Sequence, residues 1–462
     1  MNEIRFDTDL IERYGGRGPR YTSYPTAVQF HQGFGETEYR RQCAASNQGP
    51  DRRPLSIYVH LPFCESLCYY CACNKEVTRN RARVERYMTH LYTELDMQAT
   101  LFDDERVVEQ LHLGGGSPTY FSTDELGELI RRIGERFRLQ ADGNQEFSIE
   151  VDPRTIGPEG MAPLNELGFN RLSLGVQDLE ARVQEAVNRV QSFEKTRDLI
   201  DAARASGFQS VSLDLIYGLP HQTVASFDAT IDRVLSLRPD RLAIYNYAHL
   251  PEMFKAQRLI DAADLPDASE KLEILHRTIS KLTDAGYEYI GMDHFALPAD
   301  ELVLAQRKGE LQRNFQGYST HARCDLISLG VSAISHVHHC YSQNVKSVNR
   351  YCQLLEQGRL PVERGLELSD DDELRATVIE TIMCHGRLQF GDVERQFGID
   401  FDEYFADEVG ALGPLEQDGL IRLRPDGLEV TPAGRLLLRP VAMVFDRYLR
   451  EQASKTRFSK VI

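Results

Sequence analysis

The chain of 462 residues carries a formal net charge of −17 at pH 7. So acidic a chain is excluded as a general binder of nucleic acid, and an anionic substrate would need a local cluster of Arg or Lys. No apolar run approaches the roughly eighteen residues that span a membrane, and residues 1–5 lack the apolar core of a signal peptide. We therefore expect a cytoplasmic protein of two or three domains without a membrane span.

The first 50 residues are predicted to form an irregular arm. Residues 13–21 hold three arginines, two tyrosines and three glycines. The simpler interpretation is a flexible basic segment on an acidic body. The alternative is a lid that binds carboxylates, because a guanidinium pairs with a carboxylate in bidentate geometry.

Between residues 54 and 300, short apolar runs alternate with amphipathic stretches of helical period. Ser122 and Ser269 are expected to cap two of the helices. Repeated strand–helix units predict an α/β fold with a parallel sheet, closed into a full or partial (β/α) barrel. The expected strands are 56–61, 107–113, 146–151, 171–176, 210–217, 241–247 and 287–292, and the expected helices are near 81–102, 123–138, 158–167, 192–206, 224–237 and 268–285.

Polar and glycine residues follow strand after strand at the same end. In a barrel these ends meet at one mouth, where active sites lie. The glycine run could form only a tight turn, or it could let a ligand approach the backbone. Arg189 is outside this set, and a surface salt bridge is its simpler interpretation. The set comprises Gly114 to Thr119, Glu150, Asp152, Gln177, Asp178, Asp214 and Asn246 to His249.

Four of the nine cysteines lie within ten positions, at Cys64, Cys68, Cys71 and Cys73. A structural zinc site usually has a second pair of ligands a dozen or more residues away, and none lies at that distance. A disulfide suits a secreted chain better than a cytosolic one. An iron–sulfur cluster held from one loop is the favoured interpretation, and three ligands would leave one iron open to a substrate or cofactor.

The spacing Cys64-x3-Cys68-x2-Cys71, between a strand and a helix, resembles the radical S-adenosylmethionine (SAM) superfamily. The longer string that includes Tyr58, His60, Pro62, Phe63 and Cys73 resembles the oxygen-independent coproporphyrinogen III oxidases, and that resemblance extends over essentially the whole chain. Ser117 and Ala72 depart slightly from the family pattern, where threonine and glycine are usual.

The resemblance implies one 4Fe–4S cluster on Cys64, Cys68 and Cys71. It also implies SAM, two molecules of it, because two propionates are decarboxylated. Tyr58 and Cys73 would be catalytic, with Cys73 not a cluster ligand. The SAM-binding positions implied are Tyr58, Tyr70, Gly115, Gly116, Ser117, Glu150, Gln177, Arg189, Asp214, Ala248 and Ile334, with Gln316 near the second SAM.

The implied reaction converts two propionates of coproporphyrinogen III to vinyl groups, giving protoporphyrinogen IX. Arg17, Arg20 and Tyr21 of the arm would bind substrate carboxylates. A reducing donor such as flavodoxin or ferredoxin is implied, and a monomer is expected. The alternative is a haem carrier of the same superfamily without oxidase activity; the His- and Cys-rich stretches at His321, Cys324 and His336–Cys340 favour it, whereas Cys73 and the arm favour the oxidase.

The alternation of strands and helices ends near residue 300. Residues 315–318 and 329–334 are predicted to be loop and buried turn. Helices followed by a hairpin at 420–430 indicate a winged-helix-like C-terminal domain, but the acidic helix at 402–417 argues against DNA binding. A last helix is expected at 433–450. The expected domains are an arm (1–50), the barrel (51–300), a connecting segment that contributes to the active site (301–365) and a C-terminal helical domain (366–462).

Overall fold

The computed structural model describes residues 4–48, 52–321 and 324–451. The chain divides into two compact units. The barrel unit comprises Phe30–Asp267 and Arg323–Glu367, and the C-terminal unit comprises Met1–Gln29, Ala268–Ala322 and Leu368–Ile462. The sequence-based boundaries differ from this division, because the part of the arm up to Gln29 and the residues from 268 to 322 group with the C-terminal residues, whereas the arm from Phe30 onward belongs to the barrel unit.

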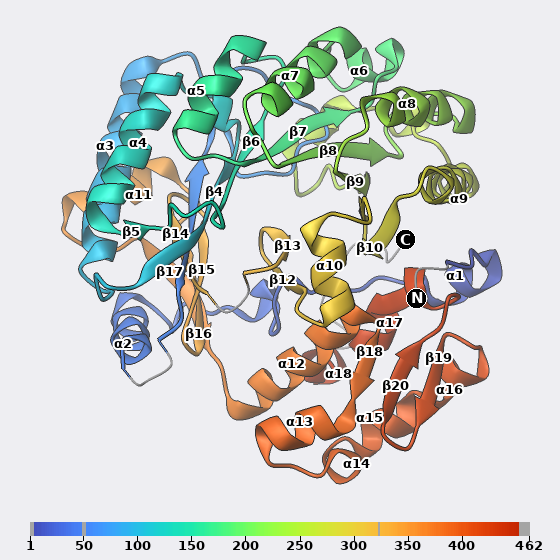
Figure 1. Ribbon diagram of the computed structural model, residues 1–462. Coiled ribbons are helices and arrows are strands. Elements are labelled where there is room, and N and C mark those ends of the chain that lie inside the picture. Colours follow the sequence, from blue (N-terminus) through green and yellow to red (C-terminus); the bar gives the residue numbers. More distant parts are fainter. Residues whose placement is uncertain (1–3, 49–51, 322–323, 452–462) are drawn as a thin grey trace. The chain divides into compact units, whose positions relative to one another are not determined.

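The barrel unit is built on one sheet whose parallel strands run in the order β9-β8-β7-β6-β4-β1-β14 (Figure 1). Six of these strands were expected from the sequence, and the structure confirms them. Their carboxyl ends lie along one edge, as parallel pairing requires. The six are β1 (Leu55–Leu61), β4 (Val107–Gly115), β6 (Glu146–Val151), β7 (Arg171–Gln177), β8 (Ser210–Tyr217) and β9 (Arg241–Asn246).

Helices cover the outer face of this sheet (Figure 1). The side chain of Ser122 accepts a hydrogen bond from the N–H of Glu125 and so caps α4, as predicted. The expected helix at 158–167 begins as a short 3-10 turn, η3 (Pro158–Gly160). The helices of the unit are α2 (Glu36–Ser46), α3 (Arg81–Ala99), α4 (Thr123–Arg136), α5 (Met161–Glu166), α6 (Ala181–Ala186), α7 (Phe193–Ala205), α8 (Val224–Leu237) and α11 (Val348–Glu356).

Four further strands extend the sheet beyond β1, in a stretch where the sequence predicted no strand and a buried turn only at 329–334. Strand β14 (Asp325–Leu329) pairs in parallel with β1, and β15 (Ile334–Val337), β16 (Cys340–Asn344) and β17 (Val362–Glu367) follow in antiparallel order. Both β14 and β16 are buried along their whole length, so they lack the alternation that marks a strand. The turn at 330–333 agrees with the buried turn expected at 329–334, and the turn at Phe315 and Gln316 agrees in part with the loop expected at 315–318.

The C-terminal unit contains a three-stranded sheet in the order β18-β20-β19, with helices beside it. The hairpin expected at 420–430 is confirmed. The helix expected at 402–417 is divided into three short helices, and the one expected at 433–450 into a 3-10 turn and two short helices. Its elements are α1 (Thr8–Tyr14), η1 (Ala27–Gln29), α9 (Ala268–Asp284), β10 (Glu288–Gly291), β11 (His294–Ala296), α10 (Glu301–Lys308), β12 (Gln312–Asn314), β13 (Gly317–Ser319), α12 (Asp370–His385), β18 (Arg387–Gln389), α13 (Phe390–Phe397), α14 (Phe401–Tyr404), α15 (Ala406–Ala411), α16 (Gly413–Gln417), β19 (Ile421–Arg424), β20 (Gly427–Val430), η6 (Arg435–Leu437), α17 (Leu438–Met443) and α18 (Arg447–Glu451).

Two local expectations fail in this unit. Ser269 lies inside α9, which begins at Ala268, and so it does not cap that helix. The arm is not irregular throughout, because it contains α1 and is tied to its unit by side-chain contacts. Arg13 pairs with Asp418 at 2.7 Å, for example.

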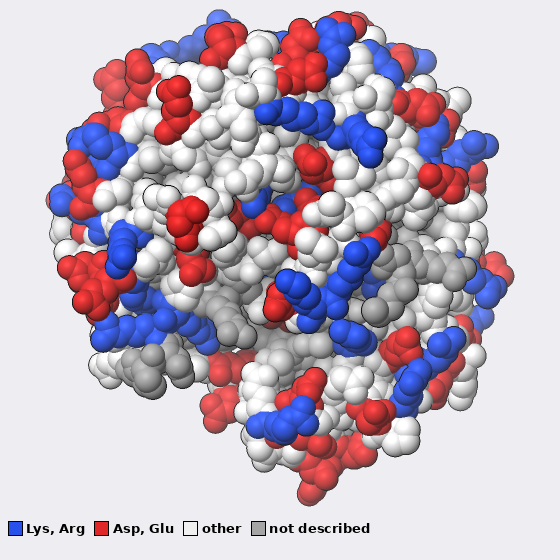
Figure 2. Space-filling view, in the orientation of Figure 1, with Lys and Arg blue, Asp and Glu red and all other residues white. Residues whose placement is uncertain are grey.

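Acidic and basic side chains are intermingled over the face of the molecule that Figure 2 shows. No broad basic surface is visible on that face among the described residues. Within the described part of the chain, no helix is both long and apolar enough to cross a bilayer.

Candidate functional site: the cysteine loop and the barrel mouth

The cysteine loop is closed at its base by two short parallel strands, β2 (Phe63–Cys64) and β3 (Glu76–Val77). The N–H of Glu76 donates to the carbonyl of Pro62 at 2.6 Å, and the N–H of Thr78 donates to that of Cys64 at 3.2 Å. Because both ends are fixed, the residues from 65 to 75 form a compact loop that follows β1.

The loop is held against other segments of the barrel unit by hydrogen bonds to its backbone. The N–H of Tyr69 donates to the carbonyl of Val187 at 3.0 Å. Asn188 Nδ2 donates to Leu67 O at 2.8 Å, and Gln257 Nε2 donates to Tyr70 O at 3.0 Å. Three contacts from two distant segments therefore fix where the cysteines lie.

Two arginines surround the Sγ atom of Cys68. Arg154 Nη2 lies 3.4 Å from it and Arg189 Nη1 lies 3.5 Å from it. Asp152 pairs with both guanidinium groups, at 2.7 and 3.1 Å, and so orients them. Donors of this kind stabilise a thiolate, which is the form of cysteine that binds metals.

Arg189 is only 6% exposed, so its interpretation as a surface salt bridge is wrong. Its Nη2 donates to the carbonyl of Gly175 at 2.6 Å. A Cβ on Gly175 would lie 2.9 Å from both Arg189 Nη2 and Gln177 Nε2, so a larger residue here would displace the ends of these two side chains. Gln177 ends β7 with a left-handed backbone, φ 69°.

The other two thiols of the loop interact with each other. The hydrogen bond with Cys73, together with the charge of Lys75, lowers the pKa of Cys71 to about 6, although burial opposes the shift. The same hydrogen bond raises the pKa of Cys73. Lys75 Nζ also donates to the carbonyl of Cys71 at 2.9 Å. Cys71 is therefore the thiol of this pair that is poised to be a thiolate.

The donor set fits an iron–sulfur cluster better than a single zinc ion. Burial and the charges of Cys71 and Cys68 raise the pKa of Cys64, which shows that the three thiols share one environment. Among the described residues, no three His, Cys, Asp or Glu side chains converge on one ion-binding point. A 4Fe–4S cluster does not require such convergence, because each thiolate binds a different iron.

The glycine run after β4 brings two backbone segments into close contact. A Cβ on Gly116 would lie 2.7 Å from Phe63 O, and Gly116 N–H donates to Leu61 O at 2.8 Å. Gly115, at φ 117°, donates its N–H to Glu150 Oε2 at 3.2 Å. Gly116 therefore packs against the base of the cysteine loop, and Gly115 positions the carboxylate of Glu150.

Two partly exposed carboxylates, Glu150 and Asp214, come from β6 and β8, the strands on either side of β7. Glu150 is 3.4 Å from His112 Nε2, and that hydrogen bond helps to lower the pKa of Glu150 despite its burial. Burial, and the charge of Glu150, raise the pKa of Asp214 to about 7, and Ser173 Oγ donates to Asp214 at 3.2 Å. One carboxylate is thus held ionised while the other titrates near neutral pH.

Tyr58 lies close to Glu150, one of these two carboxylates. Its ring stacks on His112, with the centroids 5.7 Å apart, and its hydroxyl lies 3.1 Å from His60 Nδ1. His60 Nε2 contacts the carbonyl of Asn74 at 2.8 Å, in the cysteine loop. A chain of contacts therefore links the loop to Tyr58 and Glu150.

The remaining expected site residues lie in different places. Tyr70 packs against Val187 and its apolar neighbours, and Ala248 is exposed after β9. Ser117 is buried before the 3-10 turn η2 (Pro118–Tyr120). Ile334 begins β15 in the barrel unit, whereas Gln316 lies in the C-terminal unit between β12 and β13.

The three proposed substrate residues of the arm all lie in the C-terminal unit. Arg17 is exposed. Arg20 forms an ion pair with Asp293. Tyr21 is buried and donates its hydroxyl hydrogen bond to Asp446 at 2.9 Å, so its side chain also stabilises the fold.

Sequence reasoning missed three residues of the site: Arg154, His112 and Lys75. Arg154 follows Asp152 directly after β6, so its position at a strand end was an available signal. His112 lies within β4, and only the register of the sheet reveals that it faces Ser148 and Glu150.

The His-rich stretch at 336–340 is mostly structural. His338 and His339 form the two-residue turn between β15 and β16, because Val337 pairs with Cys340. His336 stacks on Tyr341, with the ring centroids 4.3 Å apart. Among the described residues the stretch does not bring three metal-ligating groups together.

Comparisons with known proteins agree with this geometry. Residues 58–234 match the model of the Radical SAM superfamily, and residues 368–437 match the HemN C-terminal domain. The fold and the cysteine loop therefore define a radical SAM protein, a class that implies a 4Fe–4S cluster and SAM.

Relatives cover the entire chain. The oxygen-independent coproporphyrinogen III oxidase of Pseudomonas aeruginosa is 51% identical over 462 residues, covering 100% of both chains, and that of Escherichia coli is 47% identical with the same coverage. The solved structure of coproporphyrinogen III oxidase (HemN) from Escherichia coli, a radical SAM enzyme, superimposes with a TM-score of 0.92, covering 97% of this chain and 100% of that one. The chain belongs to the family of oxygen-independent coproporphyrinogen III oxidases.

Proposed function

We propose that this protein catalyses the oxygen-independent oxidative decarboxylation of two propionate side chains of coproporphyrinogen III to vinyl groups, giving protoporphyrinogen IX for haem biosynthesis. The observation that carries the proposal is the full-length similarity to oxidases of this name at 51% and 47% identity, combined with the loop that fixes Cys64, Cys68 and Cys71.

Cys64, Cys68 and Cys71 would hold the 4Fe–4S cluster, which supplies the electron that cleaves SAM to methionine and a 5′-deoxyadenosyl radical. Arg154 and Arg189 donate hydrogen bonds to the Sγ atom of Cys68 and so hold this ligand in place. Lys75 lowers the energy of the Cys71 thiolate by its charge. These residues keep the loop compact and partly shielded from water, which suits a radical reaction.

Glu150 and Asp214 would bind the polar groups of SAM, such as its ammonium group and ribose hydroxyls. Tyr58 would lie beside the cofactors, since its contacts already link the loop to Glu150. Cys73 would act without binding iron, because its pKa is raised while that of Cys71 is lowered.

The other SAM contacts are proposed from the family resemblance. Two SAM molecules would suit two decarboxylations. These contacts are Tyr70, Gly115, Gly116, Ser117, Gln177, Arg189, Ala248 and Ile334, with Gln316 near the second SAM.

Arg17, Arg20 and Tyr21 would bind the substrate, which carries four propionates, since guanidinium groups pair well with carboxylates. In domain terms, residues 1–50 would be the lid, 51–300 the radical SAM barrel, 301–365 the connecting segment and 366–462 the C-terminal domain. We further propose that the protein is a cytoplasmic monomer and that flavodoxin or ferredoxin supplies its electrons.

An anaerobic turnover assay tests the function. Reconstituted, reduced protein is mixed with SAM and coproporphyrinogen III, and vinyl porphyrin and 5′-deoxyadenosine are measured together. Matched formation of both is expected. Deoxyadenosine without vinyl product would move the proposal to another substrate, and tight haem binding with neither product would replace it with the haem carrier.

A further inference from the structure

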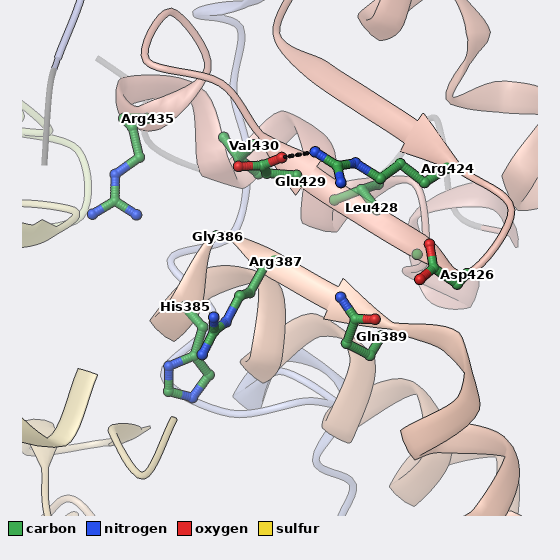
Figure 3. Close-up of a pocket in the computed structure, with 11 residues that line it drawn as sticks. His385, Gly386, Arg387, Gln389, Arg424, Asp426, Leu428, Glu429, Val430 and Arg435 are labelled. Carbon is green, nitrogen blue, oxygen red and sulfur yellow. Dashed lines mark hydrogen bonds and ion pairs between the residues drawn. The ribbon is translucent and has the colours of Figure 1, made fainter. Parts of the chain in front are cut away.

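A cavity of about 270 Å³ lies in the C-terminal unit, on the sheet β18-β20-β19 (Figure 3). Its walls come from the end of α12, from β18, from the β19–β20 hairpin and from η6. The residues that line it include none of those assigned above to the cluster, SAM or the porphyrin substrate. The cavity is therefore formed by residues other than those proposed for the oxidase reaction.

Arg435 lines the cavity and is only 7% exposed. Its Nη2 donates to the carbonyl of Tyr289 at 3.2 Å, and its Nε is buried without a hydrogen-bond partner among the described residues. No carboxylate within the described part of the chain forms an ion pair with it, and burial lowers its pKa. A buried guanidinium without a counter-charge is unfavourable, and an anion in the cavity would compensate it.

Two more basic groups lie at the same end of the cavity. In Figure 3, the guanidinium of Arg435 points from η6 toward the side of the cavity where Arg387 and His385 lie next to each other. Arg387 is exposed and forms no ion pair with any described residue. His385 Nδ1 is buried without a hydrogen-bond partner among the described residues, and burial and the charge of Arg387 lower the pKa of His385 to about 4, so the ring adds no negative charge to this end of the cavity.

Gly386 lies between these groups, and its missing side chain lets the guanidinium of Arg435 approach the backbone. Gly386 has φ 62°, and a Cβ there would lie 2.9 Å from Arg435 Nη1. At the other end of the cavity, Arg424 is already paired with Glu429 at 3.0 Å, near Asp426. The uncompensated positive charge is therefore confined to the end formed by Arg387 and Arg435.

We propose that this cavity binds a small oxyanion, a phosphate or carboxylate group on a small molecule, through Arg435 and Arg387. A guanidinium fork matches both kinds of anion. The volume of about 270 Å³ is below the range typical for drug-sized ligands, so a porphyrin is excluded and a group of a few heavy atoms fits.

The test is the melting temperature of the full-length protein, titrated with inorganic phosphate or with succinate while chloride holds the ionic strength constant. A ligand that binds only the native state raises Tm in a saturable way. We expect saturation in the parent protein, and an apparent affinity weaker by about tenfold or more for Arg387→Met and for Arg435→Met, because each loses charge-assisted hydrogen bonds. Phosphate and succinate, compared side by side, distinguish the two oxyanion sources.

The matched control is Arg422→Met, which removes an exposed charge from the same hairpin but outside the cavity. This variant should retain the full response. Equal responses in all variants would mean general charge binding and would overturn the proposal, as would the absence of a response to both anions. If Arg435→Met does not fold, Arg387→Met decides alone, because its side chain is exposed. No measurement in this test depends on turnover, so the result is independent of the proposed oxidase activity.

Discussion

At the scale of single residues, neighbouring side chains set the environment of the thiols in the cysteine loop. Arg154 and Arg189 donate to Cys68, while Cys73 and Lys75 favour the thiolate of Cys71. The four cysteines were evident in the sequence because their spacing is local. The contacts of the two arginines with Cys68 were not evident, because 86 and 121 positions separate them from Cys68 and only the folded sheet brings them to it.

Cys68→Ala is expected to abolish the cluster and all turnover, because one of the three proposed iron ligands is lost. Cys73→Ala should retain the cluster and lose turnover, since Cys73 is proposed not to bind iron. Iron content, the visible absorbance of the reconstituted protein and the anaerobic assay check both. Retained activity in Cys68→Ala, or a lost cluster in Cys73→Ala, would contradict these assignments.

The arm arginines should differ in their effects. Arg17→Ala is expected to raise KM for coproporphyrinogen III with Tm unchanged, because Arg17 is exposed. Arg20→Ala should also lower Tm, since Asp293 loses its partner. Steady-state kinetics and thermal melts on both variants check this. An unchanged KM in Arg17→Ala would remove that residue from the substrate site.

At the scale of elements, the strand that carries the glycine run decides how the loop is placed. Strand β4 ends at Gly115, and the run continues through Gly116 to contact the segment between β1 and β2. The sequence left open whether the run was only a turn. The run packs closely against a second backbone segment, which is possible because glycine has no side chain. SAM binding by the run stays a proposal.

Gly116→Ala should weaken the closure of the loop and reduce cluster loading, because the added Cβ would lie 2.7 Å from backbone atoms that cannot move independently. The matched control is Gly410→Ala in α15, where nothing lies within 4 Å of the added Cβ. That control should be neutral or more stable by about 0.5–1 kcal/mol. Iron content and thermal melts separate the two. Equal cluster loading would show that the glycine is not required.

At the scale of the whole molecule, the barrel unit is tied together by a buried carboxylate. Glu94 on α3 is 0% exposed. It accepts hydrogen bonds from the N–H of Gly330 at 2.7 Å, from Asn344 Nδ2 at 2.7 Å and from the hydroxyl of Tyr351. Burial raises the pKa of Glu94 to about 7. The network joins α3 to β14, β16 and α11, which are the elements that the sequence predicted least well.

The sign of the pH effect follows from that pKa. The native carboxyl group keeps its proton at a pH where the unfolded chain has lost it, so this contribution to stability is complete below about pH 4.5 and is lost as the pH rises toward 7. The loss amounts to about 3 kcal/mol. Glu94→Gln should therefore show a smaller fall in Tm between pH 5 and pH 8 than the parent protein, whatever its absolute stability.

The control for this experiment is Glu85→Gln, an exposed position on the same helix. It should leave the pH profile of Tm unchanged. A Glu94→Gln profile parallel to that of the parent protein would show that Glu94 is ionised in the native state.

The sequence alone determined the features that depend on local spacing. These are the six parallel strands, the helices between them, the cysteine motif and the hairpin at 420–430. Each leaves a periodic or short-range pattern in the chain. Only the tertiary structure decided that β14 to β17 complete the sheet, that Arg189 is buried beside Cys68, and that the part of the arm up to Gln29 belongs with the C-terminal unit. Those outcomes depend on contacts between residues far apart in the chain, and a fully buried strand or a paired arginine carries no periodic signal.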